Sequence, residues 1–318
     1  MPFPYKTVLI TGATAGIGLA LAERMISNGI FVIAVGRRSD RLDALVAKHG
    51  ADKVAAEPFD VSDLDKLPGW VEKMTKTHPS LSSIVLNAGF QRTVDFTNPD
   101  TVSLSSLSSE MTTNYLSPLH TLSLFLPHLI SLGPETPASV VLVSSGLGVV
   151  PMARCPNYCA TKSAIHSLAW TLRSQLSAPS SPETHHIRVV EIIPPAVQTE
   201  LHSSQPDLVK AGQTKIGVPL EQYADETWDL LTESTLHDEI VIKLVRERWG
   251  AIEKEKLDAF RTFEAMFRAK PKSTSARQTL DERSKILDDG LKTAKKTLAE
   301  GGRACIHPGT DCPLIIDQ

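Results

Sequence analysis

Short runs of apolar residues alternate with longer segments of helical period from residue 7 onward, and this alternation limits the possible folds more than any other feature. The runs are rich in Val, Ile and Leu with little polar alternation, which is typical of strands buried on both faces of a parallel sheet. A helical segment over 17–28 separates the first two runs and ends at Gly29, a residue suited to a helix C-terminus. We expect strands at Thr7–Thr11, Phe31–Val35, Lys53–Pro58, Ser83–Leu86, Val140–Ser144, Val189–Ile193 and Glu239–Leu244.

Strand, helix and strand repeating at this spacing predict an α/β fold with a doubly wound, mostly parallel sheet of about seven strands. Right-handed crossovers would place helices on both faces of that sheet. We assign residues 1–245 to this domain, including a substrate loop over 200–225. Residues 246–318 are expected to form a helical extension with an irregular tail.

The extension and two surface segments carry their own patterns. Apolar and aromatic residues recur near helical spacing over 245–267, which predicts an amphipathic helix that packs on its own domain or on a sister subunit. A weaker leucine stripe over 280–298 predicts a second helix after a linker at 270–276. Stretches rich in Ser, Thr and Pro at 98–109 and 178–183 are expected to be surface loops.

Composition excludes several classes of protein. The hydrophobic share of 42% is ample for a buried core, and the net charge of −3 argues against a nucleic-acid binder. No basic-then-apolar leader and no apolar run of membrane-spanning length are present, so we expect a cytoplasmic protein without a membrane partner. Four cysteines in a chain this long make no disulfide scaffold, and no metal-binding spacing occurs; whether Cys305 and Cys312 pair stays open.

A glycine-rich turn follows the first predicted strand and opens the first predicted helix. It reads Thr11-Gly12-Ala13-Thr14-Ala15-Gly16-Ile17-Gly18. Such glycines let a pyrophosphate approach the backbone, and the helix N-terminus offers N–H donors and partial positive charge. Loose glycine spacing alone also serves plain turns, but the position between a strand and a helix favours a dinucleotide. The expected contacts are Gly12, Thr14, Ala15, Gly16, Ile17 and Gly18.

Two arginines, Arg37 and Arg38, stand at the end of the second predicted strand, where an acidic residue would instead accept hydrogen bonds from a ribose diol. Guanidinium groups suit bidentate contact with a 2′-phosphate, so this end favours NADP(H) over NAD, although two solvated turn charges would read the same way. After the third strand, Asp60 and Val61 are expected to hold the adenine edge. After the fourth, Asn87, Ala88 and Gly89 would let the backbone pass close to the cofactor.

Tyr158 and Lys162 lie four residues apart in Tyr158-Cys159-Ala160-Thr161-Lys162, on one face if that segment is helical. Reduction of a carbonyl group needs a proton donor, and a tyrosine with a reference pKa near ~10 serves at neutral pH only if a nearby cation stabilises its phenolate. Lys162 would supply that field and also hold the nicotinamide ribose, which Tyr158 would adjoin. Chance Tyr-x-x-x-Lys pairs are common on helices, so the pair alone is weak.

Two further side chains make the set more specific. Ser145 lies thirteen residues before Tyr158, just past a predicted strand, where its hydroxyl would polarise a substrate oxygen. Asn114 begins Asn114-Tyr115-Leu116-Ser117-Pro118, where its amide would fix a water beside the lysine. Taken singly, Ser145 reads equally well as a helix cap and Asn114 as a turn residue.

At this point the chain resembles a short-chain dehydrogenase/reductase, a family with a Rossmann-like fold. Its glycine motif matches Thr11–Gly18, its Asn-Ala-Gly motif matches Asn87–Gly89, and its catalytic tetrad matches Asn114, Ser145, Tyr158 and Lys162, the similarity covering about residues 5–245. The resemblance implies Tyr158 as general acid/base, Lys162 as the partner that lowers its pKa, Ser145 as donor to the substrate oxygen and Asn114 as anchor of a proton relay. It also implies cofactor contacts from Pro194, Val197 and Thr199, and a homodimer or homotetramer.

The chain also departs from that family. Pro194-Pro195 replaces the usual Pro-Gly, which stiffens the loop on the nicotinamide side and removes one N–H donor. The substrate walls are expected in 90–108, 146–157 and 200–225, with 147–152 and 201–219 forming a mobile lid. Among the wall residues are Phe90, Gln91, Met152, Cys155 and His202, the last as readily a surface residue as a substrate contact.

These patterns predict an NADPH-dependent carbonyl reductase that interconverts a ketone or aldehyde and an alcohol. Two other readings stay open: a catalytically silent NADP-binding regulatory or scaffold protein, and a non-redox enzyme using the same pocket for cyclisation or isomerisation. The substrate itself and the preferred direction are not fixed by the sequence.

Overall fold

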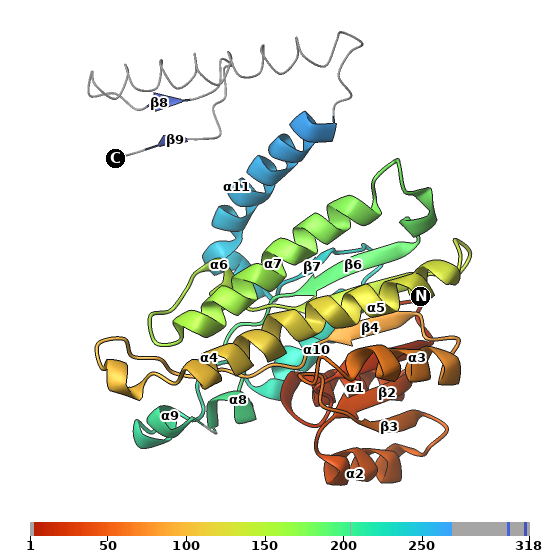
Figure 1. Cartoon of the computed structure of the whole chain (residues 1–318), viewed down its shortest axis with the longest axis horizontal. Helices are drawn as coiled ribbons and strands as arrows, with labels where there is room; N and C mark the ends of the chain where they lie inside the picture. Colours follow the sequence, from red (N-terminus) through yellow and green to blue (C-terminus); the bar gives the residue numbers. More distant parts are fainter. Residues whose placement is uncertain (1–2, 204, 269–303, 306–314, 317–318) are drawn as a thin grey trace. The chain divides into compact units, whose positions relative to one another are not determined.

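A computed structural model describes residues 3–203, 205–268, 304–305 and 315–316 of the chain (Figure 1). Two compact units follow one another along the sequence, Met1–Arg248 and Trp249–Gln318. The second unit contains most of helix α11 (Lys243–Arg268) and the antiparallel strands β8 (Ala304–Cys305) and β9 (Ile315–Ile316). Helix α11 confirms the helix expected over 245–267. The linker expected at 270–276 and the helix expected over 280–298 lie outside the described residues, as does Cys312.

Among the described residues, seven parallel strands form the main sheet in the order β3-β2-β1-β4-β5-β6-β7. The α/β sheet predicted from the sequence is therefore confirmed, and the strand ends mostly agree within two residues. The seventh strand was predicted to reach Leu244 but is shorter, because α11 begins at Lys243. The strands are β1 (Thr7–Thr11), β2 (Phe31–Gly36), β3 (Val54–Pro58), β4 (Ser83–Leu86), β5 (Ala138–Val143), β6 (Ile187–Ile192) and β7 (Glu239–Ile240).

Helices connect the strands and cover both faces, as the crossovers require. In Figure 1, α5 and α7 run across the strands as two long neighbouring helices. The helices of the first unit are α1 (Gly16–Ser27), α2 (Ser39–His49), α3 (Leu67–Thr77), α4 (Leu104–Met111), α5 (Ser117–Ser131), α6 (Gly146–Val149), α7 (Pro156–Leu176), α8 (Glu200–Ser203), α9 (Pro206–Lys210) and α10 (Leu220–Thr232), with a π-helical turn η2 (Thr112–Leu116) and 3-10 turns η1 (Pro99–Thr101) and η3 (Pro182–Thr184).

One apolar core lies between the sheet and helices α3, α5 and α7. Phe125 of α5 is fully buried there, and burial of a side chain of this size stabilises a fold by about 2 kcal/mol. Trp70 of α3 packs edge-on against Phe125 and stacks on Phe59 with ring centroids 4.5 Å apart. Because strand residues alternate between faces, the neighbours of core residue Leu9 point to the opposite side, where α1 packs against α10.

The Ser- and Thr-rich stretch 98–109 was expected to be a surface loop. It is largely exposed, but its second half is helical, so the loop prediction is wrong there. Ser103 caps helix α4 by accepting a hydrogen bond from Ser106 N at 3.2 Å. Serines favour caps as well as loops, so composition did not distinguish the two. The other predicted loop, 178–183, is confirmed as a largely exposed turn that runs into η3.

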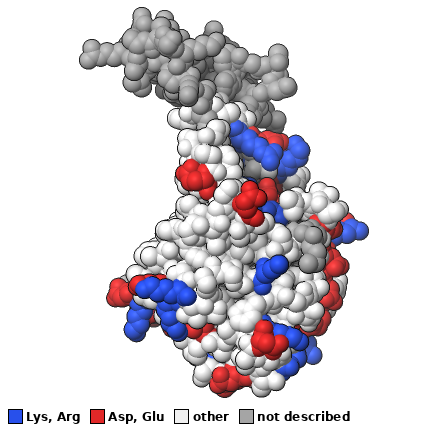
Figure 2. Space-filling model, turned by 90° about the vertical axis from the view of Figure 1, so that its right-hand side faces the viewer, with Lys and Arg blue, Asp and Glu red and all other residues white. Residues whose placement is uncertain are grey.

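Within the described residues, no helix has both the length and the apolar character needed to cross a bilayer. On the face shown in Figure 2, acidic and basic side chains lie next to one another, with broad uncharged surface between them. That face therefore presents no extended field of one sign.

Candidate active site

The loops that follow β1, β2, β4, β5 and β6 meet at the carboxyl edge of the sheet. β1 has β2 on one side and β4 on the other, so the strand order reverses at β1. In open α/β sheets, ligands bind beyond the carboxyl ends of the strands at such a reversal. Nearly all site residues predicted from the sequence stand on these loops or on the helices that follow them.

The glycine turn between β1 and α1 has the shape that a pyrophosphate needs. Gly12 and Gly16 have φ angles of 73° and 55°, a region that residues with a Cβ rarely adopt. A Cβ on Gly12 would lie 2.8 Å from Asn87 Nδ2 and 2.9 Å from Ala88 Cα, so the backbones there are in close contact. Helix α1 begins at Gly16 with no capping side chain and no acidic residue in its first turn, which leaves its N-terminus suited to an anion.

Hydrogen bonds from Asn87 and Ala88 join the loop after β4 to Thr11 at the end of β1. Thr11 Oγ1 accepts hydrogen bonds from Asn87 N at 3.0 Å and from Ala88 N at 3.1 Å. Asn87 Nδ2 donates to Thr11 O at 3.0 Å, so its side chain joins the β1 and β4 loops. Gly89 lies beside the catalytic candidates, because a Cβ there would be 3.0 Å from Asn114 Oδ1 and 3.7 Å from Lys162 Nζ.

Arg38 lies on the glycine turn. Its Nε and Nη2 donate to Thr14 Oγ1 at 3.0 and 2.8 Å, and its Nη1 reaches Glu200 Oε2 at 2.7 Å. Arg41 Nη1 completes the group, at 2.6 Å from Glu200 Oε1 and 3.3 Å from Thr14 O. We call Arg38, Arg41 and Glu200 the arginine clasp. The two guanidinium groups lower the pKa of Glu200, against the smaller effect of burial.

Arg37 lies apart from the clasp. Its side chain is 74% exposed and its Nη1 lies 3.6 Å from Asp60 Oδ2. Asp60 Oδ1 accepts hydrogen bonds from Ser62 N at 3.0 Å and Ser62 Oγ at 2.7 Å. Val61 is buried and belongs to the main core. The structure thus brings only one of the two predicted arginines, Arg38, onto the glycine turn.

Tyr158 and Lys162 lie one turn apart on α7, with Lys162 Nζ 5.6 Å from the centre of the Tyr158 ring. Both side chains are buried, at 7% and 5% exposed. Lys162 Nζ donates to Val143 O at 2.7 Å, at the end of β5. Ser145 follows that strand end and caps α6, since its Oγ accepts from Leu147 N at 3.1 Å. Ser145 is therefore a helix cap, and as a cap it still lies beside Tyr158.

Burial controls the ionisation of this pair. It raises the pKa of Tyr158 far above 10, and the hydrogen bond between Tyr158 and Ser145 is the largest opposing effect. Burial also lowers the pKa of Lys162 to about 8, while the negative charge of Glu191 raises it. The predicted role of Lys162, lowering the pKa of Tyr158, stays a prediction. Its ammonium lies 5.6 Å from the centre of the Tyr158 ring and donates to Val143 O.

Asn114 connects the turn after β4 to α7. It lies in the π-helical turn η2 and is 1% exposed. Its Oδ1 accepts from Phe90 N at 3.0 Å, and its Nδ2 donates to Phe90 O at 2.8 Å and to Thr161 Oγ1 at 3.2 Å. π-Helical turns are rare and occur often at functional sites. The side chain is held in place beside Gly89 and the lysine.

The loop after β6 approaches both the catalytic candidates and the glycine turn. Pro194 O accepts from Gly146 N at 2.8 Å, next to Ser145. Val197 is buried and forms an isolated bridge with Val218. A Cβ on Gly16 would lie 3.3 Å from the Thr199 side chain, so Thr199 contacts the glycine turn.

The expected substrate walls come together around Gln91. Its Nε2 donates to Cys155 Sγ at 3.4 Å, and its Oε1 accepts from Gln205 Nε2 at 3.0 Å. Arg154 bonds to Gln205 as well, and its Nε reaches Asp207 Oδ2 at 2.7 Å. These contacts join α9 to the segment before α7.

The other predicted wall residues differ in exposure. Met152 is 48% exposed, whereas Cys155 is buried with its sulfur 4.0 Å from that of Cys159. His202 was expected to be a surface residue or a substrate contact. It is buried, which contradicts the surface reading and leaves the substrate contact a prediction. Its Nδ1 lies 3.1 Å from Val197 O, and burial lowers its pKa.

Sequence reasoning missed five residues that the structure places at or beneath the site. Arg41 and Glu200 complete the clasp, and Arg154 joins the substrate walls. Glu191 and His166 form a buried pair next to the catalytic candidates. A signal existed for Glu191, because it is the acidic residue in the otherwise apolar strand segment Val189–Ile193. Among the described residues, no group of three or more His, Cys, Asp or Glu side chains has the arrangement of a metal site.

Comparisons with known proteins identify the family of this chain. A model of the short chain dehydrogenase family matches residues 6–208. The chain is 39% identical over 233 residues to the uncharacterized oxidoreductase DltE of Bacillus subtilis (strain 168), covering 73% of this chain and 87% of that protein. It is 31% identical over 207 residues to the benzil reductase ((S)-benzoin forming) IRC24 of Saccharomyces cerevisiae, covering 62% and 73%.

Solved structures show the same fold. A short-chain dehydrogenase from Sphingobium yanoikuyae in complex with NADPH has a TM-score of 0.64 and 25% identity, covering 85% of this chain and 99% of that one. The closed form of serine dehydrogenase with NADP+ has a TM-score of 0.64 and 24% identity, covering 74% and 94%. With the family model matching more than half of its length, this chain belongs to the short-chain dehydrogenase/reductase family of oxidoreductases.

Proposed function

We propose that the protein is an NADP(H)-dependent carbonyl reductase that converts a ketone or aldehyde to the alcohol. The observation that carries the proposal is the buried group Tyr158, Lys162 and Ser145 at the carboxyl edge, beside a glycine turn with an open helix N-terminus. Residues 1–245 would hold the whole catalytic apparatus, with 246–318 as an extension. A homodimer or homotetramer in the cytoplasm is the expected form of the enzyme.

The residues at the glycine turn fit a dinucleotide. Gly12 packs so closely on Asn87 and Ala88 that a Cβ would not fit there, which keeps the turn tight, and α1 offers uncapped N–H groups. Bound NADPH would supply the hydride. Thr14, Ala15, Ile17 and Gly18 of the turn, Gly89 beyond β4, and Pro194, Val197 and Thr199 beyond β6 would line its path.

The arginine clasp favours NADP(H) over NAD(H). Two guanidinium groups next to Thr14 suit a 2′-phosphate, which accepts several charge-assisted hydrogen bonds. Arg38 and Arg41 are better placed for this contact than the exposed Arg37, which with Asp60 and Val61 would flank the adenine. Solved neighbours include complexes with NADP+ and NADPH, and one with NADH, the Brucella melitensis 3-ketoacyl-(acyl-carrier-protein) reductase. The cofactor preference therefore rests on the arginines of this chain.

Each member of the catalytic group has a separate task. The Ser145 hydroxyl would donate to the carbonyl oxygen, and Tyr158 would pass its phenolic proton to that oxygen as the alkoxide forms. Lys162, with its ammonium 5.6 Å from the ring centre, would stabilise the phenolate that remains and hold the nicotinamide ribose. Asn114 would anchor the path by which the proton is replaced.

The ionisation state of Tyr158 supports reduction at neutral pH. Because burial raises the pKa of Tyr158, the phenol carries its proton and is ready to act as an acid. Alcohol oxidation needs the phenolate as base, so the reverse reaction is expected to require alkaline conditions.

The test follows NADPH consumption by the pure protein with a panel of ketones and aldehydes. Tyr158→Phe should lower turnover at least ~10²-fold while NADPH still binds, since general acid catalysis contributes about that much. Tyr223→Phe is the matched control, because Tyr223 is also buried but lies on α10. Unchanged turnover in Tyr158→Phe would exclude the assigned role.

Two other functions give different results in the same assay. Tight NADPH binding with no consumption on any substrate would favour a silent regulatory or scaffold protein. A substrate that is isomerised or cyclised without NADPH consumption would identify a non-redox enzyme. We favour the reductase because a binding-only protein has no use for a buried phenol beside a buried ammonium.

A further inference from the structure

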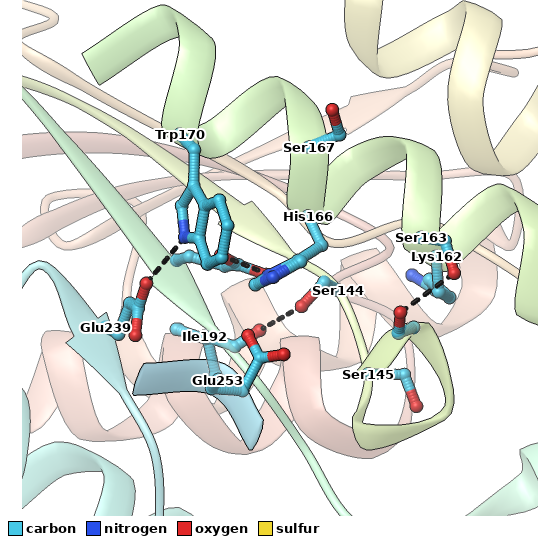
Figure 3. Close-up of polar contacts among 12 residues, drawn as sticks. Ser144, Ser145, Lys162, Ser163, His166, Ser167, Trp170, Ile192, Glu239 and Glu253 are labelled. Atoms are coloured by element: carbon cyan, nitrogen blue, oxygen red, sulfur yellow. Dashed lines mark hydrogen bonds and ion pairs between the residues drawn. The ribbon is translucent and has the colours of Figure 1, made fainter. Parts of the chain in front are cut away.

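A buried acid–imidazole pair, Glu191 and His166, borders the catalytic candidates and has no part in the mechanism above. Figure 3 shows His166 on the helix that also carries Lys162. Glu191 of β6 is 0% exposed and His166 of α7 is 4% exposed. His166 Nδ1 lies 2.9 Å from Glu191 Oε1 and 3.1 Å from Glu191 Oε2. Burying a carboxylate inside a protein costs several kcal/mol unless it is paired, so such a group calls for a physical reason.

The pair borders the site from two sides. His166 is one turn beyond Lys162, so both side chains extend from the same face of α7, as Figure 3 shows. Glu191 pairs in register with Leu142, one residue before Val143, whose carbonyl accepts the Lys162 ammonium. On the other side, the Ser144 hydroxyl lies between two acceptors, the Glu191 carboxylate, whose pKa it lowers, and Ile192 O at 3.5 Å, and Ser144 directly precedes Ser145.

We propose that Glu191, clamped by His166, is a positioning residue for the reaction: its carboxylate fixes the Ser144–Ser145 turn and acts as the buried counter-charge of Lys162. The inference rests on the proposed roles of Ser145 and Lys162. A lysine must stay charged to stabilise a neighbouring phenolate, and burial works against that charge. The negative charge of Glu191 raises the pKa of Lys162 and so opposes the burial.

Other groups around Glu191 set its own charge. Burial raises the pKa of Glu191, His166 and Ser144 lower it, and Glu239 on β7 raises it further. Glu239 pairs in register with Glu191 and accepts from Trp170 Nε1 at 2.7 Å. It therefore also bonds to α7, from the neighbouring strand, whereas the carboxylate that raises the pKa of Lys162 is that of Glu191. This makes Glu239→Gln the matched control for Glu191→Gln.

The first measurement is the pH profile of kcat for NADPH-dependent reduction. Glu191→Gln keeps the shape of the side chain and removes its charge, so the pKa of Lys162 should fall further. The alkaline limb of the profile should then move to lower pH by about one unit. Glu191→Asp keeps the charge and should retain the wild-type limb, with a lower kcat, because the shorter side chain holds Ser144 and His166 less well. Glu239→Gln should leave the limb in place.

Two further readouts need no turnover. The pH dependence of the NADPH dissociation constant should shift with the same variant, since Lys162 would contact the ribose. A double-mutant cycle between Glu191→Gln and Lys162→Met, scored by urea unfolding, should be non-additive and needs no cofactor. If the wild type reduces no carbonyl compound, the proposed function fails while these two arms still test Glu191.

A purely structural role would give a different set of results. An unchanged alkaline limb in Glu191→Gln, an equal shift in Glu239→Gln, or additive effects in the cycle would each overturn the proposal. Should Glu191→Gln fail to fold, Glu191→Asp decides, because a displaced limb in a variant that keeps the charge contradicts the counter-charge role.

Discussion

Replacing Lys162 by methionine should stabilise the protein at neutral pH while removing a residue that we place in the active site. Burial lowers the pKa of Lys162 from 10.5 to about 8, and its side chain is 5% exposed. This difference corresponds to about 3 kcal/mol of unfolding free energy that the folded protein loses by keeping the lysine charged below about pH 8. Methionine has similar length and no charge. It leaves Val143 O without its donor, which costs about 1 kcal/mol, so a net gain of about 2 kcal/mol is expected.

The gain should depend on pH in a definite direction. The pKa of Lys162 is lower in the folded than in the unfolded state, so between about pH 8 and 10.5 the folded protein binds fewer protons there. Wild-type stability therefore gains from this residue as the pH rises through that window, whereas the variant lacks this contribution. By about pH 9.5 the advantage of the variant should fall below about 1 kcal/mol.

Urea unfolding of both proteins at about pH 7 and about pH 9.5 measures the effect. Lys73→Met is the control, because the Lys73 side chain is 60% exposed, contacts Glu57 at the surface and should change stability by less than about 0.5 kcal/mol. A Lys162→Met variant that is less stable than wild type at neutral pH would refute the reasoning. A gain that does not vary with pH would refute its electrostatic basis.

Three other substitutions address the cofactor site and the loop after β6. Arg38→Ala should weaken NADPH binding about 10- to 100-fold, more than Arg37→Ala does, and should change NADH binding little. Equal losses of affinity for both cofactors would exclude a contact between Arg38 and the 2′-phosphate. Glu200→Gln should tighten NADPH binding up to about fivefold, because it removes the carboxylate that competes with a 2′-phosphate for Arg38 and Arg41; weaker binding in titrations would show that Glu200 orders the arginines instead. Gly217→Ala should lower the free energy of unfolding by more than about 2 kcal/mol, since φ is 97° and its Cβ would lie 2.1 Å from Ala196 O. Gly29→Ala, where φ is 78° and the space is open, should lower it by about 1 kcal/mol. Equal losses in thermal unfolding would contradict the clash.

The sequence predicted those parts of the fold that depend on local pattern. Strand β1 (Thr7–Thr11) and strand β4 (Ser83–Leu86) agree with their predicted bounds, because apolar runs flanked by turn residues define a buried strand. The stretch 98–109 did not match its predicted structure, since serine is common both in loops and at helix caps. Only the hydrogen bond that Ser103 accepts from the backbone N–H of Ser106 identifies Ser103 as a helix cap.

In the candidate site, residue types were predictable and partners were not. The order of Asn114, Ser145, Tyr158 and Lys162 along the chain predicted the group that the structure brings together. Which groups face one another depends on side chains that meet across elements far apart in sequence. Arg38 meets Glu200 over a separation of 162 residues, and no local pattern encodes that contact.

The bridge between Val197 and Val218 has a consequence for how the enzyme can diversify. Gln198 N donates to Val218 O and Val218 N donates to Ala196 O, both at 2.9 Å, so the two ends of the intervening stretch are pinned together at its base. Closing a longer or shorter stretch across a fixed base changes the closure free energy only slowly with length. Insertions, deletions or exchanges between those ends can therefore change the predicted substrate loop while the sheet stays as it is.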